Sequence, residues 1–250
     1  MSLTKLVRRQ FEKMGLNLSW RRADNGPPLP LLRLLAEHCV LTEGKGAVIQ
    51  VGANDGLMRD PVHGIIVELG LPALLVEPLP DLFARLKANY AGVPNIAFEN
   101  TAVGAKGGDA EIYRIGAAAH VPDWAQGLAS FEKRVLLRHR RALRAADKDF
   151  ERHIETVRVP VVTVAQLLGR HPGIGKIMLL QIDTEGHDFA VIQSAVAANC
   201  LPPIIHYEHK HLGYADQAAC RELLTPYGYS FLSDETDTLA YRPPAGSPAS

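Results

Sequence analysis

Strand-like and helix-like segments alternate along most of the chain, and this alternation limits the possible folds more than any other feature of the sequence. The first strand-like segment is the apolar run at 47–51, Ala-Val-Ile-Gln-Val, which a glycine-rich turn closes. Strands that alternate with helices pair in parallel, because right-handed helical crossovers connect them. We therefore expect an α/β fold with a doubly wound, mostly parallel sheet.

The apolar patterns and turn residues predict where the elements lie. Strands are predicted at 47–51, 74–76, 95–98, 177–182 and 203–207, helices at 31–41, 57–70, 80–90, 187–198 and 215–225, and a closing antiparallel hairpin at 229–232 and 238–241. Doubly wound sheets bind ligands outside the carboxyl ends of their strands. The candidate site residues therefore follow strands directly, at 52–56, 77–79, 99–103, 183–187 and 208–211.

Residues 116–155 do not fit the alternation. They contain a loop followed by a polar, helix-like stretch from Lys133 to Arg152 that is dense in Arg and Lys. Such an insertion beside a site often covers the substrate, although a solvated charged helix has the same composition. We expect an N-terminal helical extension (1–45), a main domain (46–242) that carries this helical insertion, and a disordered tail (243–250).

Charge and cysteine usage limit the partners and the compartment. The 27 basic residues balance the 27 acidic ones, which argues against nucleic acid as a partner. The three cysteines, Cys39, Cys200 and Cys220, form no metal or disulfide pattern and fit buried reduced thiols. The sequence has no apolar run of transmembrane length and no signal-peptide core. We expect a cytoplasmic protein, and a homo-oligomer remains open.

Six cations and interspersed apolar residues occupy the first 22 residues. We favour a peripheral helix packed on the domain over a helix lying on a membrane surface, because six cations are few for anchoring.

The glycine-rich turn at 52–56, Gly-Ala-Asn-Asp-Gly, indicates the cofactor class. A nicotinamide fingerprint requires glycine at position 54, where this chain has Asn54. Asn54 and Asp55 suit an amino-acid moiety, and Asp55 would repel a pyrophosphate. Glu77, at the end of the second predicted strand, is well placed to accept both ribose hydroxyls. A cofactor with a ribose, an aminocarboxylate and no phosphate fits better than NAD, and S-adenosylmethionine is such a molecule.

Four segments resemble, in the same order, the FkbM-type family of S-adenosylmethionine-dependent methyltransferases. They are VIQVGANDG, LLVEPLPDLFARLKAN, NIAFENTAVG and LLQIDTEGHDFAVIQSA, and the resemblance runs from about residue 46 to 208. It implies a class I, Rossmann-like methyltransferase fold with a seven-stranded, mostly parallel sheet. It also implies O-methylation of a hydroxyl on a sugar, a glycan or a natural-product small molecule. Gln50 departs from the Asp that is common in the family, which would weaken a contact near the methionine amino group.

The resemblance also implies the residues that bind S-adenosyl-L-methionine. Gly52, Asn54 and Gly56 would shape the methionine pocket, Glu77 would hold the ribose, and Asp183 would face the sulfonium. The full predicted set is Gly52, Ala53, Asn54, Asp55, Gly56, Glu77, Asn100, Thr101, Ala102 and Asp183, with the three residues at 100–102 near the adenine. The stretch that starts at Asp183 also suits a helix N-cap, and the two roles can coexist.

A hydroxyl is a poor nucleophile until its proton is removed, so a general base or a metal is expected. The predicted catalytic residues are His187, His209, Glu208 and Asp183, with either histidine as the base and Glu208 orienting it or binding a substrate hydroxyl. A divalent cation held by Asp183, Glu208, His209 and His211 is possible but not favoured, because the spacing follows no recognised pattern.

Two other functions remain open. An NAD-dependent sugar oxidoreductase is disfavoured by Asn54 and by the lack of a Tyr-x-x-x-Lys pair. A non-catalytic cofactor-binding module would have lost cofactor residues, whereas the motifs of this chain are intact.

Overall fold

The structure is a computed structural model that describes residues 30–116, 119–122, 125 and 127–243. Contacts divide the chain into Met1–Pro30 and Leu31–Ser250, and the description below concerns the second unit. The predicted basic helix in the first 22 residues lies outside the described residues, as do residues 244–250 of the predicted tail.

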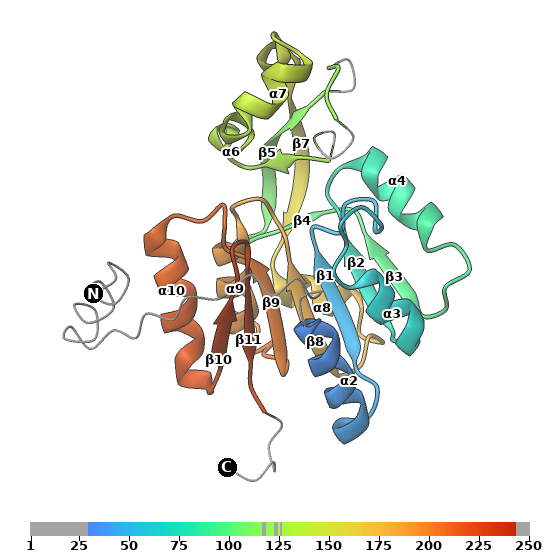
Figure 1. The fold of residues 1–250 in the computed structure, drawn as a ribbon. Helices are drawn as coiled ribbons and strands as arrows, with labels where there is room; N and C mark the ends of the chain where they lie inside the picture. Colours follow the sequence, from blue (N-terminus) through green and yellow to red (C-terminus); the bar gives the residue numbers. More distant parts are fainter. Residues whose placement is uncertain (1–29, 117–118, 123–124, 126, 244–250) are drawn as a thin grey trace, which may run out of the picture. The chain divides into compact units, whose positions relative to one another are not determined.

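The main sheet has seven strands in the order β10-β11-β9-β8-β1-β2-β3 (Figure 1). Strand β11 runs antiparallel to both of its neighbours, and the other pairs are parallel, which confirms the predicted sheet and its closing hairpin. The strands are β1 (Ala47–Val51), β2 (Ala73–Val76), β3 (Ile96–Glu99), β8 (Ile177–Ile182), β9 (Ile204–Glu208), β10 (Ser230–Ser233) and β11 (Asp237–Tyr241).

Helices cover both faces of this sheet because its central strands are apolar on both sides. In β1, Ile49 and Val51 belong to one core cluster, with the helices α8 (Val164–Arg170), α9 (Asp188–Ala197) and α10 (Tyr214–Leu224). Val48 belongs to the other cluster, with α2 (Leu31–Glu43), α3 (His63–Leu69) and α4 (Pro80–Asn89). A 3₁₀ turn, η2 (Thr225–Tyr227), follows α10. None of the described helices is long and apolar enough to cross a membrane.

Helix α2 is part of the domain core. Its residues Ala36 and Cys39 are fully buried in the same cluster as Val48 and Leu179. The border of the domain therefore lies before Leu31, and not after residue 45 as expected from the sequence.

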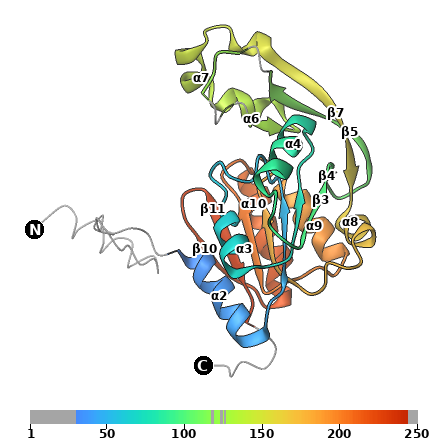
Figure 2. The ribbon, with the colours of Figure 1, turned by 90° about the vertical axis from the view of Figure 1, so that its right-hand side faces the viewer.

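The insertion is a small α/β unit and not only a helical one. A second sheet, in the order β4-β7-β5-β6, joins β4 (Ala102–Val103), β5 (Gly108–Ile115), β6 (Ala129–Ser130) and β7 (Ile154–Val162). Figures 1 and 2 show it beyond one end of the main sheet. The polar stretch predicted as one helix is divided into α6 (Lys133–Arg138), α7 (Arg140–Ala146) and the 3₁₀ turn η1 (Phe150–His153). Leu136, Leu143 and Phe150 give the unit a core of its own.

Candidate active site

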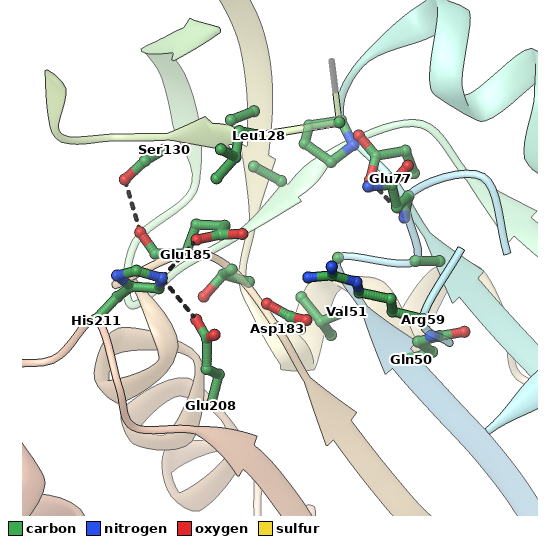
Figure 3. Close-up of a pocket in the computed structure, with 18 of the residues that line it drawn as sticks. Gln50, Val51, Arg59, Glu77, Leu128, Ser130, Asp183, Glu185, Glu208 and His211 are labelled. Atoms are coloured by element: carbon green, nitrogen blue, oxygen red, sulfur yellow. Dashed lines mark hydrogen bonds and ion pairs between the residues drawn. The ribbon is translucent and has the colours of Figure 1, made fainter. Parts of the chain in front are cut away.

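A cavity of about 540 Å³ lies between the carboxyl ends of the main strands and the insertion. Figure 3 shows Glu77 at one end of this cavity and Glu185, Glu208 and His211 at the other, with Asp183 between them. The insertion closes one side of it with residues 127–131, His139 and Ala142. The cavity therefore opens where a doubly wound sheet is expected to bind its ligand.

The turn after β1 brings two strand ends into close contact. Gly52 has φ 83°, and a Cβ at this position would lie 1.8 Å from the backbone oxygen of Asp183. Only glycine fits here, because a side chain would meet backbone that cannot move aside. Gly52 and Ala53, two of the residues predicted to bind the cofactor, line the cavity.

The other residues of the turn have different surroundings. Asn54 lines the cavity, and its Oδ1 accepts a hydrogen bond from the backbone N–H of Asp55. The Asp55 carboxylate accepts the N–H groups of Leu57 and Met58, at 3.0 and 2.8 Å, and Asp55 is not among the cavity residues. A Cβ on Gly56 would lie 2.5 Å from the Leu86 side chain. Asp55 therefore stabilises the turn through its backbone hydrogen bonds, and Gly56 lets the turn pack closely against α4.

Glu77 follows β2 and is 4% exposed. Its Oε2 accepts the N–H of Asn54 and its Oε1 accepts the N–H of Leu79, both at 2.9 Å. A carboxylate oxygen can accept a second hydrogen bond, so both oxygens keep capacity for donors from the cavity. Burial raises the pKa of Glu77 to about 7, although the two backbone hydrogen bonds act in the opposite direction.

Of the three residues predicted to lie near the adenine, two line the cavity and one does not. Thr101 and Ala102 line the cavity, and the buried Oγ1 of Thr101 has no hydrogen-bond partner among the described residues. Asn100 instead donates from Nδ2 to the backbone oxygens of Glu77 and Pro78, at 2.8 and 3.1 Å. Asn100 is therefore placed to hold the Glu77 loop.

Several titratable groups gather at the far end of the cavity. His211 Nε2 lies 3.1 Å from Glu185 Oε2 and 3.8 Å from Glu208 Oε2. Burial, followed by mutual repulsion, raises the pKa of the Asp183 and Glu208 carboxyls, and burial lowers the pKa of His211. Asp183 is exposed to the cavity, although it lies deep among protein atoms.

Neither histidine predicted as the base is among the cavity residues. His187 stacks on Phe131, with ring centroids 4.2 Å apart. The Nδ1 atom of His209 makes a 3.0 Å hydrogen bond with Thr238 Oγ1 on β11. The geometry therefore favours Asp183, Glu208 and His211 as the groups that meet an acceptor.

Two cavity residues that matter here received no role from the sequence, although one of them, Glu185, lies within the candidate stretch 183–187. Glu185 follows β8 within the quoted motif, so its position after a strand was the available signal. Arg59 lines the cavity with a left-handed backbone, φ 54°, which is uncommon for a residue with a side chain. The sequence around Arg59 predicted a helix and gave no sign of this turn.

The insertion forms hydrogen bonds with the loops of the site. Ser130 Oγ donates to the backbone oxygen of Glu185 at 2.7 Å, and Arg138 Nη1 donates to the backbone oxygen of His211 at 3.1 Å. A Cβ on Gly127 would lie 2.3 Å from Asn54 Nδ2. The insertion therefore contacts the loops at both ends of the cavity.

These features fit S-adenosylmethionine. Glu77 has free acceptor capacity for ribose hydroxyls, Thr101 has a buried polar atom without a partner among the described residues, and Gly52 lets the turn after β1 approach the end of β8 closely. The seven-stranded sheet, the glycine-rich turn after β1 and the acidic residue after β2 define a Rossmann-like methyltransferase fold of the S-adenosylmethionine-dependent class.

The comparison with protein families agrees with this class. The profile of the methyltransferase FkbM domain matches residues 50–231, well over half of the chain. The chain belongs to the FkbM methyltransferase domain family. No curated protein sequence matches it.

Solved methyltransferases resemble the chain at low identity. The FkbM methyltransferase from Methylobacillus flagellatus KT has 13% identity and a TM-score of 0.47, over 79% of this chain and 44% of that one. This chain thus spans less than half of that protein's length. The O-methyltransferase TomG from Streptomyces achromogenes, solved with S-adenosylmethionine, has 10% identity and a TM-score of 0.43 over 95% and 88% of the two chains. The N-terminal domain of human METTL16, solved with S-adenosylhomocysteine, has 11% identity and a TM-score of 0.41 over 96% and 82%.

Proposed function

We propose that this protein transfers a methyl group from S-adenosyl-L-methionine to a hydroxyl of a sugar, a glycan or a natural-product small molecule. One observation carries the proposal. A single cavity joins the Gly52 turn and Glu77, which suit the donor, to the acidic groups around Asp183, which suit activation of a hydroxyl.

Residues at one end of the cavity would hold the donor. The Glu77 carboxylate would accept the ribose hydroxyls, and Thr101 Oγ1 would contact the adenosine moiety. The Arg59 guanidinium, which has no acidic partner among the described residues, would bind the donor's carboxylate. When bound, the donor supplies an electrophilic methyl group on a sulfonium.

Residues at the other end would bind and activate the acceptor. The cavity would align the acceptor oxygen with the methyl carbon and the sulfur, and such orientation can contribute up to ~7–11 kcal/mol. Asp183, between the two ends, is the favoured proton acceptor. Asp183 would accept the proton of the acceptor hydroxyl, whose oxygen would take the methyl group from the bound donor while the electron pair of the C–S bond stays on sulfur.

The insertion limits the size of the acceptor that the cavity can hold. Residues 127–131 line the cavity on the side of the insertion, and among them Phe131 contributes an aromatic ring, which also stacks on His187. Sugar rings combine hydroxyls with an apolar face, so an acceptor of this kind suits both the acidic groups and the aromatic ring. The three cysteines are unpaired and buried, and on this ground we keep the cytoplasm as the proposed location.

Two measurements test the function. Calorimetry of the full chain with S-adenosylhomocysteine, and separately with NAD, should show binding of the first and not of the second. Transfer of a radiolabelled methyl group from S-adenosylmethionine to a panel of sugars, glycans and hydroxylated natural products should then identify the acceptor class. Binding of NAD alone would overturn the proposal, and binding of the donor without transfer to any hydroxyl would favour a binding module.

A further inference from the structure

Three side chains of different elements converge at the acceptor end of the cavity. Glu185 lies in the loop after β8, Glu208 is the last residue of β9, and His211 lies in the loop after β9. One carboxylate oxygen from each glutamate and one ring nitrogen of His211 lie within 4.8 Å of one another. Figure 3 shows the three side chains pointing toward a common point.

The His211 side chain is buried and the two glutamate side chains are partly buried, yet the three groups do not satisfy one another's hydrogen-bonding capacity. Glu185 Oε2 and Glu208 Oε2 have no hydrogen-bond partner among the described residues. The His211 side chain is 4% exposed, and its Nε2 faces both oxygens without forming a hydrogen bond to either. Buried polar atoms without partners are unfavourable and rare, so the arrangement calls for a group that all three can bind.

The spacing of the three atoms suits a cation. Ligand atoms about 2.1 Å from a shared ion are about 3 Å apart when they are adjacent in an octahedron and about 4.2 Å apart when opposite. The observed separations from His211 Nε2, 3.1 and 3.8 Å, fall in this range. The surroundings contain further carboxylates, since Asp183 and Asp188 lie near Glu208, and two cations, Lys210 and Arg138, which lie near His211.

We propose that Glu185, Glu208 and His211 form a divalent-cation site at the acceptor end of the cavity. Two carboxylates and one imidazole suit a hard or borderline ion such as Mg²⁺ or Mn²⁺. All three residues line the cavity, so an acceptor in the cavity could reach a cation held by them. If the proposed function holds, the acceptor oxygen binds there, the cation lowers the pKa of its hydroxyl, and Asp183 accepts the proton.

The experiment measures Mn²⁺ binding to the full chain by electron paramagnetic resonance and calorimetry, at pH 7.5. We expect one Mn²⁺ per chain, and Mg²⁺ should compete for it. Glu208→Gln and His211→Ala should each weaken Mn²⁺ binding by about tenfold or more. Glu222→Gln, which changes an exposed glutamate on α10, is the matched control and should bind Mn²⁺ as the wild type does.

The outcomes separate this inference from the proposed function. Wild-type protein that binds S-adenosylhomocysteine but no Mn²⁺ overturns the cation site and leaves the methyltransferase proposal standing. Mn²⁺ binding that persists in both Glu208→Gln and His211→Ala overturns the assignment of ligands. Mn²⁺ binding lost in these variants, with S-adenosylhomocysteine binding kept, supports the site and shows that the variants fold. Mn²⁺ binding without any donor binding supports the site and overturns the proposed function.

Discussion

Glu77 is buried and accepts two backbone hydrogen bonds, and in the proposed function it also receives two ribose hydroxyls. Replacing it with Gln keeps the size but turns an NH₂ group toward a backbone N–H and removes the charge. A hydrogen bond to a charged group contributes about 1.5–3 kcal/mol. We therefore expect Glu77→Gln to raise the Kd for S-adenosylhomocysteine by about tenfold or more, measured by calorimetry. An unchanged Kd, with Glu222→Gln as the control, would contradict the ribose role.

The pKa of Glu77 makes donor binding depend on pH. Burial raises this pKa to about 7, so the carboxyl is protonated below that value in the free protein and ionised above it. Ribose hydroxyls favour the ionised form, so binding below pH 7 must release a proton. The Kd for S-adenosylhomocysteine should be constant near pH 8 and rise as pH falls through 7, by up to about tenfold per pH unit. Glu77→Gln should remove this dependence, and an equal dependence in the variant would assign it to another group.

The choice of base can be decided among three residues. Asp183 lines the cavity, whereas His187 packs on Phe131 and His209 bonds to Thr238. Asp183→Asn should lower kcat by about 10²–10⁴, the usual contribution of a general base, while the donor Kd changes little. His187→Asn and His209→Asn should keep most of the activity. If a histidine variant still binds the donor but loses all methyltransferase activity, that histidine is the base.

At the scale of elements, the insertion should be separable from donor binding. Ile115 of β5 pairs with Ile154 of β7, so an Asn-Gly turn in place of residues 117–152 would close this hairpin directly. The change removes the contacts of Ser130 and Arg138 with the site loops. Methyl transfer should fall by about 10² or more, because the acceptor loses its orientation.

The donor Kd of the same variant should stay within about tenfold, because Glu77 and the Gly52 turn belong to the main sheet. Calorimetry and a cooperative melting curve check this expectation. Equal loss of donor binding and transfer would mean that the insertion is part of the core fold.

The main sheet could be predicted from the sequence, and the second sheet could not. Strands such as 177–182 are continuous apolar runs between a turn and a polar motif, and each was placed within two residues. Strands β5 and β7 pair antiparallel outside the main sheet, and their partly exposed faces mix charged with apolar residues. A weaker period-2 pattern is present in Ile154–Val162, but the predicted helix-like stretch ended at Arg152 and no element was predicted for 156–162.

The site was predictable as far as it depends on strand ends. Gly52, Glu77 and Asp183 follow strands, and each lies at the cavity. The direction of a side chain after a strand depends on loop geometry that no local pattern encodes. For this reason the sequence prediction chose His209 as a candidate base and not His211, two residues further on, whereas of these two residues only His211 lines the cavity.

For the whole molecule, donor binding should appear as stability. A ligand that binds only the folded state at 100 times its Kd adds about 2.7 kcal/mol to the free energy of unfolding. For a chain of this size that corresponds to a rise in Tm of about 5–10 °C. S-adenosylhomocysteine should produce this shift in a melting experiment, and NAD should not. A shift with NAD alone would contradict the class of cofactor.

The hairpin of β5 and β7 gives this architecture an evolutionary consequence. Gly108 and Val161 lie opposite each other where the insertion leaves the main domain, so its two borders are neighbours in space although 52 residues lie between them in the sequence. The unit between them has its own core. A gene segment encoding it can therefore be exchanged between relatives at two crossover points that leave Glu77 and the Gly52 turn in place, while the cavity lining at 127–131, His139 and Ala142 changes with the segment. Chimeras of this kind would inherit acceptor preference from one parent and the methylation machinery from the other.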